Sequence, residues 1–281
     1  MNEIAVVFGS ERHLVGTLTL PDAERPSPVA FILSNAGVIH RIGPHRFNVK
    51  LARELARAGF ATLRFDLSGL GDSGTPANAL GLDAQAAADL RAALDHVERV
   101  TGARRFVVGG ICSGAVQGRN VAVADPRVIG LWMIDGFVYP TILTSLVRVR
   151  RQLEVGGGPT VRSWMHWPVR ALRTRLLRRL GRLAGAPPAG RGRLSRAELG
   201  ASMDALVERG VRVYFIYTGS ELWTYNYANQ LRDAFRGHTF ISLVRHDFLE
   251  LVDHTLTTVA SQRQVIAALL DWARPFGLSA P

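Results

Sequence analysis

A single cysteine lies at the centre of a five-residue glycine motif. Cys112 is the middle residue of Gly110-Ile111-Cys112-Ser113-Gly114, with a short apolar run before it and a helix-like run after it. Glycine two residues before and two after the central residue is typical of a nucleophile elbow, because larger side chains would collide with the crossing strand and helix. The register favours Cys112 over Ser113. The alternative is a small buried cysteine beside a glycine turn.

A thiolate in this position would attack a carbonyl carbon and form a thioester with the acyl group. Thioesters pass their acyl group readily to amines, thiols and alcohols. The motif therefore predicts acyl transfer, or cleavage of an ester or thioester, through an acyl-enzyme on Cys112. Peptide hydrolysis by this arrangement would be unusual.

The elements around this motif alternate between strands and helices. Apolar runs predict strands over 4–8, 14–20, 29–34, 61–65, 106–109, 128–134, 211–217 and 239–244. Helical periodicity predicts helices over 46–58, 82–100, 115–124 and 262–274. The first two strands form an antiparallel hairpin, and the later alternation predicts a mostly parallel sheet covered on both faces. Right-handed crossovers then place ligand-binding loops at the carboxyl ends of the strands.

Length and composition describe an ordinary globular chain. The 281 residues fit one large α/β domain with an insertion, and the chain is 47% apolar and 20% charged. One cysteine excludes an internal disulfide and a cysteine-based zinc site. The first residues lack the pattern of a signal peptide, and no apolar run reaches the ~18 to 20 residues that a membrane span needs. We therefore expect a cytoplasmic protein without a transmembrane segment.

The net charge of +11 belongs to one segment. Residues 148–197 hold thirteen arginines and one acid, Glu154, which leaves the remainder of the chain at −1. Neither a nucleic-acid motif nor a basic-aromatic repeat accompanies this charge, so no nucleic-acid partner is expected. Glycine- and proline-rich stretches at 156–159 and 185–190 bracket the segment as hinges.

Three motifs in order resemble the α/β-hydrolase superfamily. They are the elbow at Cys112, the turn 66–73 (DLSGLGDS), and Asp253-His254-Thr255 before the last helix. The segment 41–46 (RIGPHR) is similar to small bacterial hydrolases found near exosortase systems and natural-product clusters. The resemblance covers 1–137 and 198–281 and implies an α/β-hydrolase fold. Residues 138–197 then occupy the usual place of a helical lid.

The resemblance implies an order of nucleophile, acid and histidine along the chain. His254 is the expected general base, which takes the thiol proton or forms a thiolate–imidazolium pair and later protonates the leaving group. His246 and His238 are rival histidines that we expect to be structural or exposed. The acid follows one of two strands. Glu221, after strand 211–217, is the first choice, and Asp135, after strand 128–134, is the alternative, although Asp-Gly is also a common turn.

The oxyanion hole should use the backbone N–H of Ser113, the residue after the nucleophile. A second N–H should come from the loop after strand 29–34, where Ala36, Gly37 and Val38 are all possible donors. The position of Ser113 at a helix start should also lower the pKa of the neighbouring thiol. We expect no cofactor. Asp66 and Asp72 are expected to hold their own turn.

The predicted lid suggests what the substrate carries. A helix over 169–184 places its apolar residues on one face, and that face can close over an acyl chain together with Trp164 and Trp167. The apolar positions are Val169, Leu172, Leu176, Leu180 and Leu183. Arginines such as Arg175, Arg178 and Arg179 lie around the rest and would attract an acidic acyl carrier protein or coenzyme A. Two alternatives to this recruiting role are an arginine face that is simply solvated and a helix that lies on an anionic membrane.

The function expected from the sequence is thus an acyl-transferring or acyl-cleaving enzyme of thioesterase, acyltransferase or cyclase type, in natural-product or lipid biosynthesis. A simple carboxylesterase or lactone hydrolase uses the same residues. The alternative to an enzyme is a catalytically inactive protein of the same fold that binds a ligand. It is retained because the sequence offers two candidates for the acid.

Overall fold

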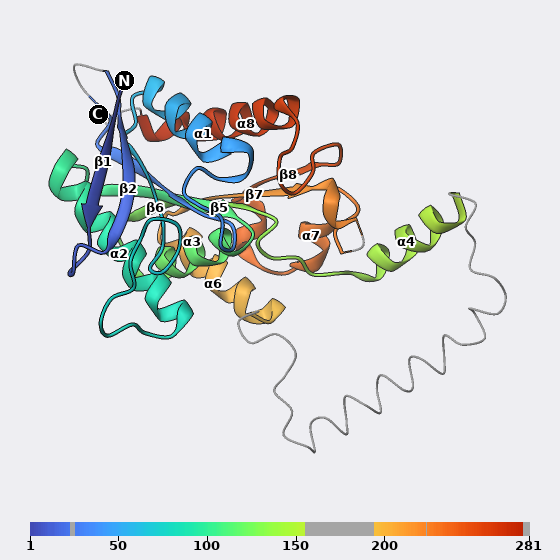
Figure 1. Ribbon diagram of the computed structural model, residues 1–281. Helices are drawn as coiled ribbons and strands as arrows, with labels where there is room; N and C mark the ends of the chain where they lie inside the picture. The colour runs from blue at the N-terminus through green and yellow to red at the C-terminus, as the bar shows by residue number, and fades with distance from the viewer. Residues whose placement is uncertain (23–25, 155–193, 223, 278–281) are drawn as a thin grey trace.

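The computed structural model describes residues 1–22, 26–154, 194–222 and 224–277. Within these ranges the core is an eight-stranded sheet in the order β1-β2-β4-β3-β5-β6-β7-β8 (Figure 1). The strands are β1 (Asn2–Phe8), β2 (Leu14–Leu20), β3 (Val29–Ser34), β4 (Thr62–Phe65), β5 (Arg105–Ile111), β6 (Val128–Ile134), β7 (Arg212–Thr218) and β8 (Arg245–Leu249). Strand β2 pairs antiparallel with β1 and β4, and the remaining pairs are parallel.

Helices cover both faces of the sheet. On one face lie α1 (Phe47–Arg57) and α8 (Val259–Gly277), and on the other lie α2 (Leu82–Thr101), α3 (Ser113–Ala124) and α6 (Arg196–Glu208) (Figure 1). Two further helices, α4 (Ile142–Glu154) and α7 (Gln230–Ala234), lie toward the β8 side of the molecule. This arrangement confirms the α/β-hydrolase fold expected from the sequence.

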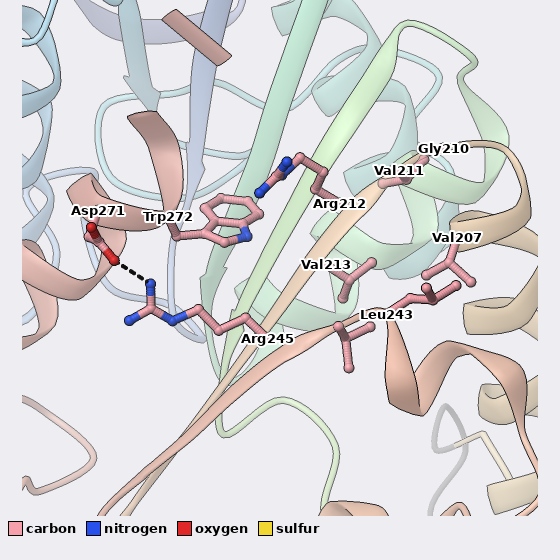
Figure 2. A pocket seen from close by; sticks show the side chains of 10 residues that line it. Val207, Gly210, Val211, Arg212, Val213, Leu243, Arg245, Asp271 and Trp272 are labelled. Carbon is pink, nitrogen blue, oxygen red and sulfur yellow. Dashed lines mark hydrogen bonds and ion pairs between the residues drawn. The ribbon is translucent and has the colours of Figure 1, made fainter. Parts of the chain in front are cut away.

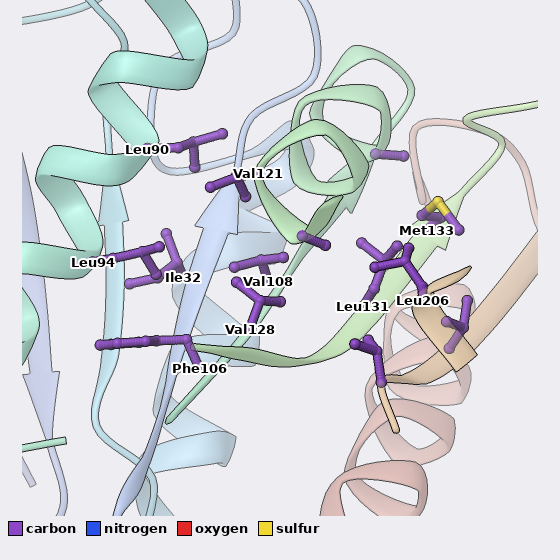
Figure 3. Close-up of a cluster of buried hydrophobic side chains, with 14 of the residues drawn as sticks. Ile32, Leu90, Leu94, Phe106, Val108, Val121, Val128, Leu131, Met133 and Leu206 are labelled. Carbon is purple, nitrogen blue, oxygen red and sulfur yellow. The ribbon is translucent and has the colours of Figure 1, made fainter. Parts of the chain in front are cut away.

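The alternation of side chains along the central strands divides the core into two layers. On β5, Phe106 and Val108 face α2, α3 and α6, whereas Val107 faces α1 and α8. Figure 3 shows the first layer, in which Leu90 and Leu94 of α2 pack toward the same sheet face. Because successive residues of a strand point to opposite faces, a strand covered on both sides must be apolar throughout. The first five residues of β3, 29–33, are buried and apolar and follow this rule.

The last strand is not where the sequence predicted it. Residues Thr239–Ser242 form a short 3-10 helix, and the final strand is β8, Arg245–Leu249. Asp204 of α6 holds the turn, because its Oδ1 accepts from the Phe240 N–H at 2.8 Å and from the Thr239 hydroxyl at 2.9 Å. The Phe240 side chain is completely buried. Phe240, which we assigned to a strand, therefore fills the core from a turn that the Asp204 carboxylate caps.

The boundaries of the predicted lid fall partly outside the described residues. Residues 155–193 are not described, and α4 and α6 lie on either side of that gap in the chain. The division into a core (1–137 and 198–281) and a lid (138–197) stays a prediction. Among the helices that the structure does describe, none has the length and apolarity needed to cross a bilayer.

Candidate active site

The cysteine motif adopts a strained turn between β5 and α3. Cys112 has φ 55° and ψ −116°, a conformation that residues with a side chain rarely adopt. The Cys112 N–H donates to the carbonyl oxygen of Ile134 on the neighbouring strand at 2.8 Å, which anchors the turn. The side chain of Cys112 is exposed at the carboxyl edge of the sheet. A buried structural cysteine, the alternative considered from the sequence, does not match this exposure.

The flanking glycines are required by close backbone contacts. A Cβ at Gly110 would lie 2.5 Å from the carbonyl oxygen of Ser34, and a Cβ at Gly114 would lie 2.7 Å from that of Asn35. Real Cβ atoms do not approach oxygen so closely, so any larger residue would push α3 away from the end of β3. The spacing that we read from the sequence therefore reflects the crossing of α3 over β3.

The histidine and one carboxylate meet beside the cysteine. Nδ1 of His254 lies 2.8 Å from Oδ2 of Asp135, the residue that follows β6. The Asp135 side chain is 1% exposed and that of His254 is 30% exposed. The interaction between the His254 imidazole and the Cys112 thiol lowers the pKa of the thiol and raises that of the imidazole. Three loops at the carboxyl edge thus bring a carboxylate and an imidazole into a hydrogen bond, and place the thiol where it interacts with the imidazole.

Among the described side chains, the carboxylate that contacts His254 is Asp135, which was the alternative from the sequence, whereas Glu221 was the first choice. Glu221 ends a short 3-10 helix (Gly219–Glu221) after β7, and its side chain lies outside the described residues. Asp135 has φ 49°, which turns its side chain toward the β7 and β8 loops. Its Oδ1 and Oδ2 accept the N–H and hydroxyl of Thr218 at 2.8 and 2.6 Å. Sequence reasoning missed Thr218, although it begins the loop in which we expected the acid.

The loops after β7 and β8 are fastened together. The His254 N–H donates to the Ser220 hydroxyl at 2.7 Å, and the Gly219 N–H donates to the Val252 carbonyl at 2.8 Å. A Cβ at Gly219 would lie only 1.8 Å from the carbonyl oxygen of Glu250, so this position admits only glycine. These contacts fix the backbone of His254, and Asp135 fixes its ring.

The electrostatics favour an ionised thiol. The hydrogen bond from His254 is the largest cause that lowers the pKa of Cys112, and the Ser113 N–H lowers it further. The hydrogen bond to Asp135 is the largest cause that raises the pKa of His254, to about 10. The two shifts stabilise the same state, a thiolate beside an imidazolium. Because the two groups are coupled, they titrate as a pair.

Alkylation by iodoacetamide should report this pair directly, since Cys112 is the only cysteine in the chain. A lowered pKa means that the thiolate forms at lower pH, so the rate should stay high below the ordinary thiol value of ~8.5. His254→Ala should move the inflection of the rate–pH profile upward. His45→Asn, at an exposed residue with left-handed backbone that asparagine tolerates, is the matched control. If the alkylation rate of the wild-type protein rose with pH at the same inflection point as that of glutathione, the ion pair would be contradicted.

The predicted oxyanion loop lies against the elbow. Among its residues, Gly37 donates its N–H to the Ser113 hydroxyl at 2.6 Å, whereas Val38 is 80% exposed. The Ala36 carbonyl accepts from Ile39 within the loop. Of the three possible donors, Gly37 is thus the one that contacts the residue after the nucleophile.

A charged network holds the far end of that loop. Arg41 donates through Nη1 to the carboxylates of Asp66 and Asp72, the latter at 2.7 Å, and its N–H also bonds Asp66. His40 Nε2 lies 3.3 Å from Asp72. The ligand atoms of His40, Asp66 and Asp72 lie within 4.8 Å of one another, as in a metal site, but the Arg41 guanidinium already supplies the cation. The network therefore joins the loop after β3 to the turn after β4.

Other residues singled out from the sequence lie elsewhere. His238 bonds Asp204 at 2.7 Å, and His246 is half-buried within β8 with a pKa lowered by burial. The lid residues Trp164, Trp167, Leu172 and Leu176, and the arginines Arg175, Arg178 and Arg179, lie outside the described residues.

One cavity is remote from these residues. It has a volume of about 540 Å³ and lies at the amino ends of β7 and β8, where Figure 2 shows Arg212, Arg245 and Trp272 around it. Cys112 follows the carboxyl end of the parallel strand β5, at the opposite edge of the sheet. This cavity is therefore not part of the candidate active site.

Comparison with solved structures identifies the fold. A serine hydrolase of Xanthomonas campestris described as lacking a lid matches with 15% identity and a TM-score of 0.59, over 100% of this chain and 98% of that one. An esterase of Pyrococcus furiosus matches with 12% identity and a TM-score of 0.62, over 98% and 91%. A proline iminopeptidase of Mycobacterium smegmatis matches with 16% identity and a TM-score of 0.60, over 100% of both chains.

Identities this low establish the α/β-hydrolase fold alone. No family model matches the sequence, and no curated protein matches it. The function of this chain must therefore be argued from its own residues.

Proposed function

We propose that the protein is an acyl-transferring or acyl-cleaving enzyme that acts on an ester or thioester through an acyl-enzyme on Cys112. The observation that carries the proposal is the hydrogen-bonded pair of Asp135 and His254, which interacts with Cys112 at a strained elbow. A strained nucleophile turn is costly, and such strain is retained where the chemistry requires it. An inactive binding scaffold would need neither the strain nor the pair.

The steps follow from the positions of these groups. The Cys112 thiolate attacks the carbonyl carbon, and the oxyanion that forms is stabilised by the N–H of Ser113 and by a second N–H from residues 36–38. The imidazolium of His254 then donates its proton to the departing alcohol or thiol, which leaves a thioester on Cys112. In the second half, neutral His254 removes a proton from water, an amine or an alcohol as it attacks that thioester. Asp135 holds the imidazole in the orientation that both halves need.

Intact-protein mass spectrometry would test the proposal. Incubation with a panel of acyl N-acetylcysteamine thioesters, p-nitrophenyl esters and lactones should add the mass of the acyl group to the protein. Prior alkylation of Cys112 should block the adduct. The ratio of free acid to amide formed when an amine is added would separate a hydrolase from an acyltransferase. No adduct with any member of the panel would favour the binding scaffold.

We further propose that the arginine-rich segment recruits an anionic acyl donor, an acyl carrier protein or a coenzyme A thioester. The proposal rests on the sequence, in which residues 148–197 carry all of the excess positive charge. Arg151, at the start of this segment, is described and pairs with Glu250 near the His254 loop at 2.6 Å. This ion pair links the start of the segment to Glu250, the residue that follows β8.

Reversing the charge of Arg175, Arg178 and Arg179 together should lower kcat/KM for coenzyme A thioesters and spare a small uncharged ester. Added salt should have the same selective effect, because exposed charges are screened beyond ~8 Å at physiological ionic strength. Equal losses on charged and uncharged substrates, or no salt dependence, would leave the segment without a recruiting role.

A further inference from the structure

The backbone turn that carries His254 has two ends, and the contacts of the candidate site hold the first. Residues 253–256 form this turn, closed by a hydrogen bond from the Leu256 N–H to the Asp253 carbonyl at 3.0 Å, with His254 as its second residue. Ser220 accepts the His254 N–H near the start of the turn. At its end, Leu256 is completely buried and has φ 55°, which is unfavourable for a residue with a β-carbon. Such a conformation persists where surrounding contacts hold it.

One of these contacts comes from a buried glutamine in the last helix. Gln262 of α8 is 2% exposed, and its Nε2 donates to the Leu256 carbonyl oxygen at 2.8 Å. A carbonyl oxygen only accepts hydrogen bonds, so this contact requires the NH₂ end of the amide. An amide turned end for end would place its own oxygen against the Leu256 carbonyl and repel it. The end of the turn thus depends on which way the Gln262 amide faces.

The single lysine of the chain decides that orientation. Lys50 lies on α1, which is beside α8 on one face of the sheet (Figure 1), and its Nζ donates to Oε1 of Gln262. An ammonium group donates hydrogen bonds and accepts none, so the amide oxygen must face Lys50. The NH₂ of the same amide must then face Leu256. The two contacts of Gln262 agree with this single orientation.

We propose that Lys50 is a positioning residue, which holds the Gln262 amide in the orientation that keeps the His254 turn in place. The inference rests on the proposed acyl-enzyme function and adds to it a residue that acts from the helix layer and not from the site. The His254 imidazole reaches Asp135 from this turn, with Nδ1 at 2.8 Å from Oδ2. A shift of the turn would therefore lengthen the contact that orients the imidazole.

Alkylation of Cys112 by iodoacetamide reports the position of His254 without any acyl chemistry. Lys50→Met keeps the apolar stem and removes the ammonium, so the amide can rotate and the turn can shift. The inflection of the alkylation rate–pH profile should move upward, toward that of His254→Ala, because His254 is the largest cause of the lowered pKa of Cys112. Acylation by p-nitrophenyl acetate should slow about 10-fold, less than the ~10²-fold that a misplacement of about 1 Å can cost.

Two further variants separate the hydrogen bond of Lys50 from its charge. Lys50→Arg keeps a charged donor and should recover most of the acylation rate and the wild-type inflection. Gln262→Met keeps Lys50 and removes the amide, so it should shift the profile at least as far as Lys50→Met. The double variant should then behave like Gln262→Met alone, because the effects of residues in one hydrogen-bonded network are not additive. Arg57→Met, which removes an exposed cation paired within α1, is the matched control and should change neither reaction.

Two results would overturn the inference. An alkylation profile of Lys50→Met that matches the wild type would show that the lysine does not position His254, whatever its effect on thermal unfolding. A shift in Lys50→Met that Gln262→Met lacks would show that Lys50 acts through its charge and not through the amide.

The failure of the proposed function would look different. If the wild-type protein is alkylated but never acylated, the acyl-enzyme proposal is wrong, and the alkylation profiles still decide whether Lys50 positions His254. If the wild type is acylated and Lys50→Met keeps both the wild-type rate and the wild-type profile, only the inference about Lys50 is wrong.

Discussion

Replacing Cys112 with alanine should abolish both the acyl adduct and turnover. The thiol is the group that forms the covalent bond, and no other cysteine exists in the chain to replace it. Loss of a nucleophile that acts together with its base costs on the order of 10⁶-fold in kcat where it has been measured in such systems. The measurement is ester or thioester hydrolysis at saturating substrate, together with the intact mass of the protein.

Cys112→Ser is the informative companion variant. Serine keeps the size of the side chain and the strained turn, but its hydroxyl ionises far less readily than a thiol, so His254 must act as a full general base. We expect slow residual turnover and an oxygen ester in place of the thioester. Full activity in Cys112→Ala would show that the elbow cysteine is not the nucleophile.

Asp135→Asn should produce the second large loss, on the order of 10²- to 10⁴-fold in kcat. The carboxylate now accepts from the His254 Nδ1–H, whereas an amide would donate to Nδ1 and leave the proton on Nε2. The imidazole would then hold the wrong tautomer and could not accept the thiol proton. The pKa of His254 should also fall, because its hydrogen bond to Asp135 is the largest cause of its elevation to about 10.

Glu221→Gln is the matched control, since it makes the same change of carboxylate to amide in the neighbouring β7 loop. We expect it to retain nearly wild-type kcat. Thermal unfolding of both variants would show whether a loss arises from the site or from the fold, because Asp135 also accepts two hydrogen bonds from Thr218. A damaging Glu221→Gln beside a fully active Asp135→Asn would restore Glu221 as the acid.

The sequence alone determined the elements whose signals are local. The register of the elbow follows from glycine spacing within five residues, and the backbone contacts of Gly110 and Gly114 explain why that spacing is required. Strands β3 and β6 begin and end where their apolar runs do, since a strand buried on both faces must be continuously apolar. The hairpin β1–β2 follows from alternation in the same way.

The tertiary structure alone decided what depends on contacts between distant residues. The apolar run 239–244 has the composition of a strand. Its first residues form a 3-10 turn instead, because Asp204, 36 positions earlier in the chain, accepts a hydrogen bond from the Phe240 N–H. The choice between Glu221 and Asp135 was of the same kind. Both carboxylates follow strands that end at one edge of the sheet, and local patterns do not say that Asp135 contacts His254.

The deciding contact joins His254 to a residue 119 positions earlier in the chain. Asp135 reaches His254 because β6 lies between β5 and β7, because its backbone turns at positive φ, and because Thr218 binds its carboxylate. The hydrogen bond between Ser113 and Gly37 likewise joins two loops 76 positions apart. Spacing along the chain carries no information on such contacts, since their geometry is set only when the strands pair.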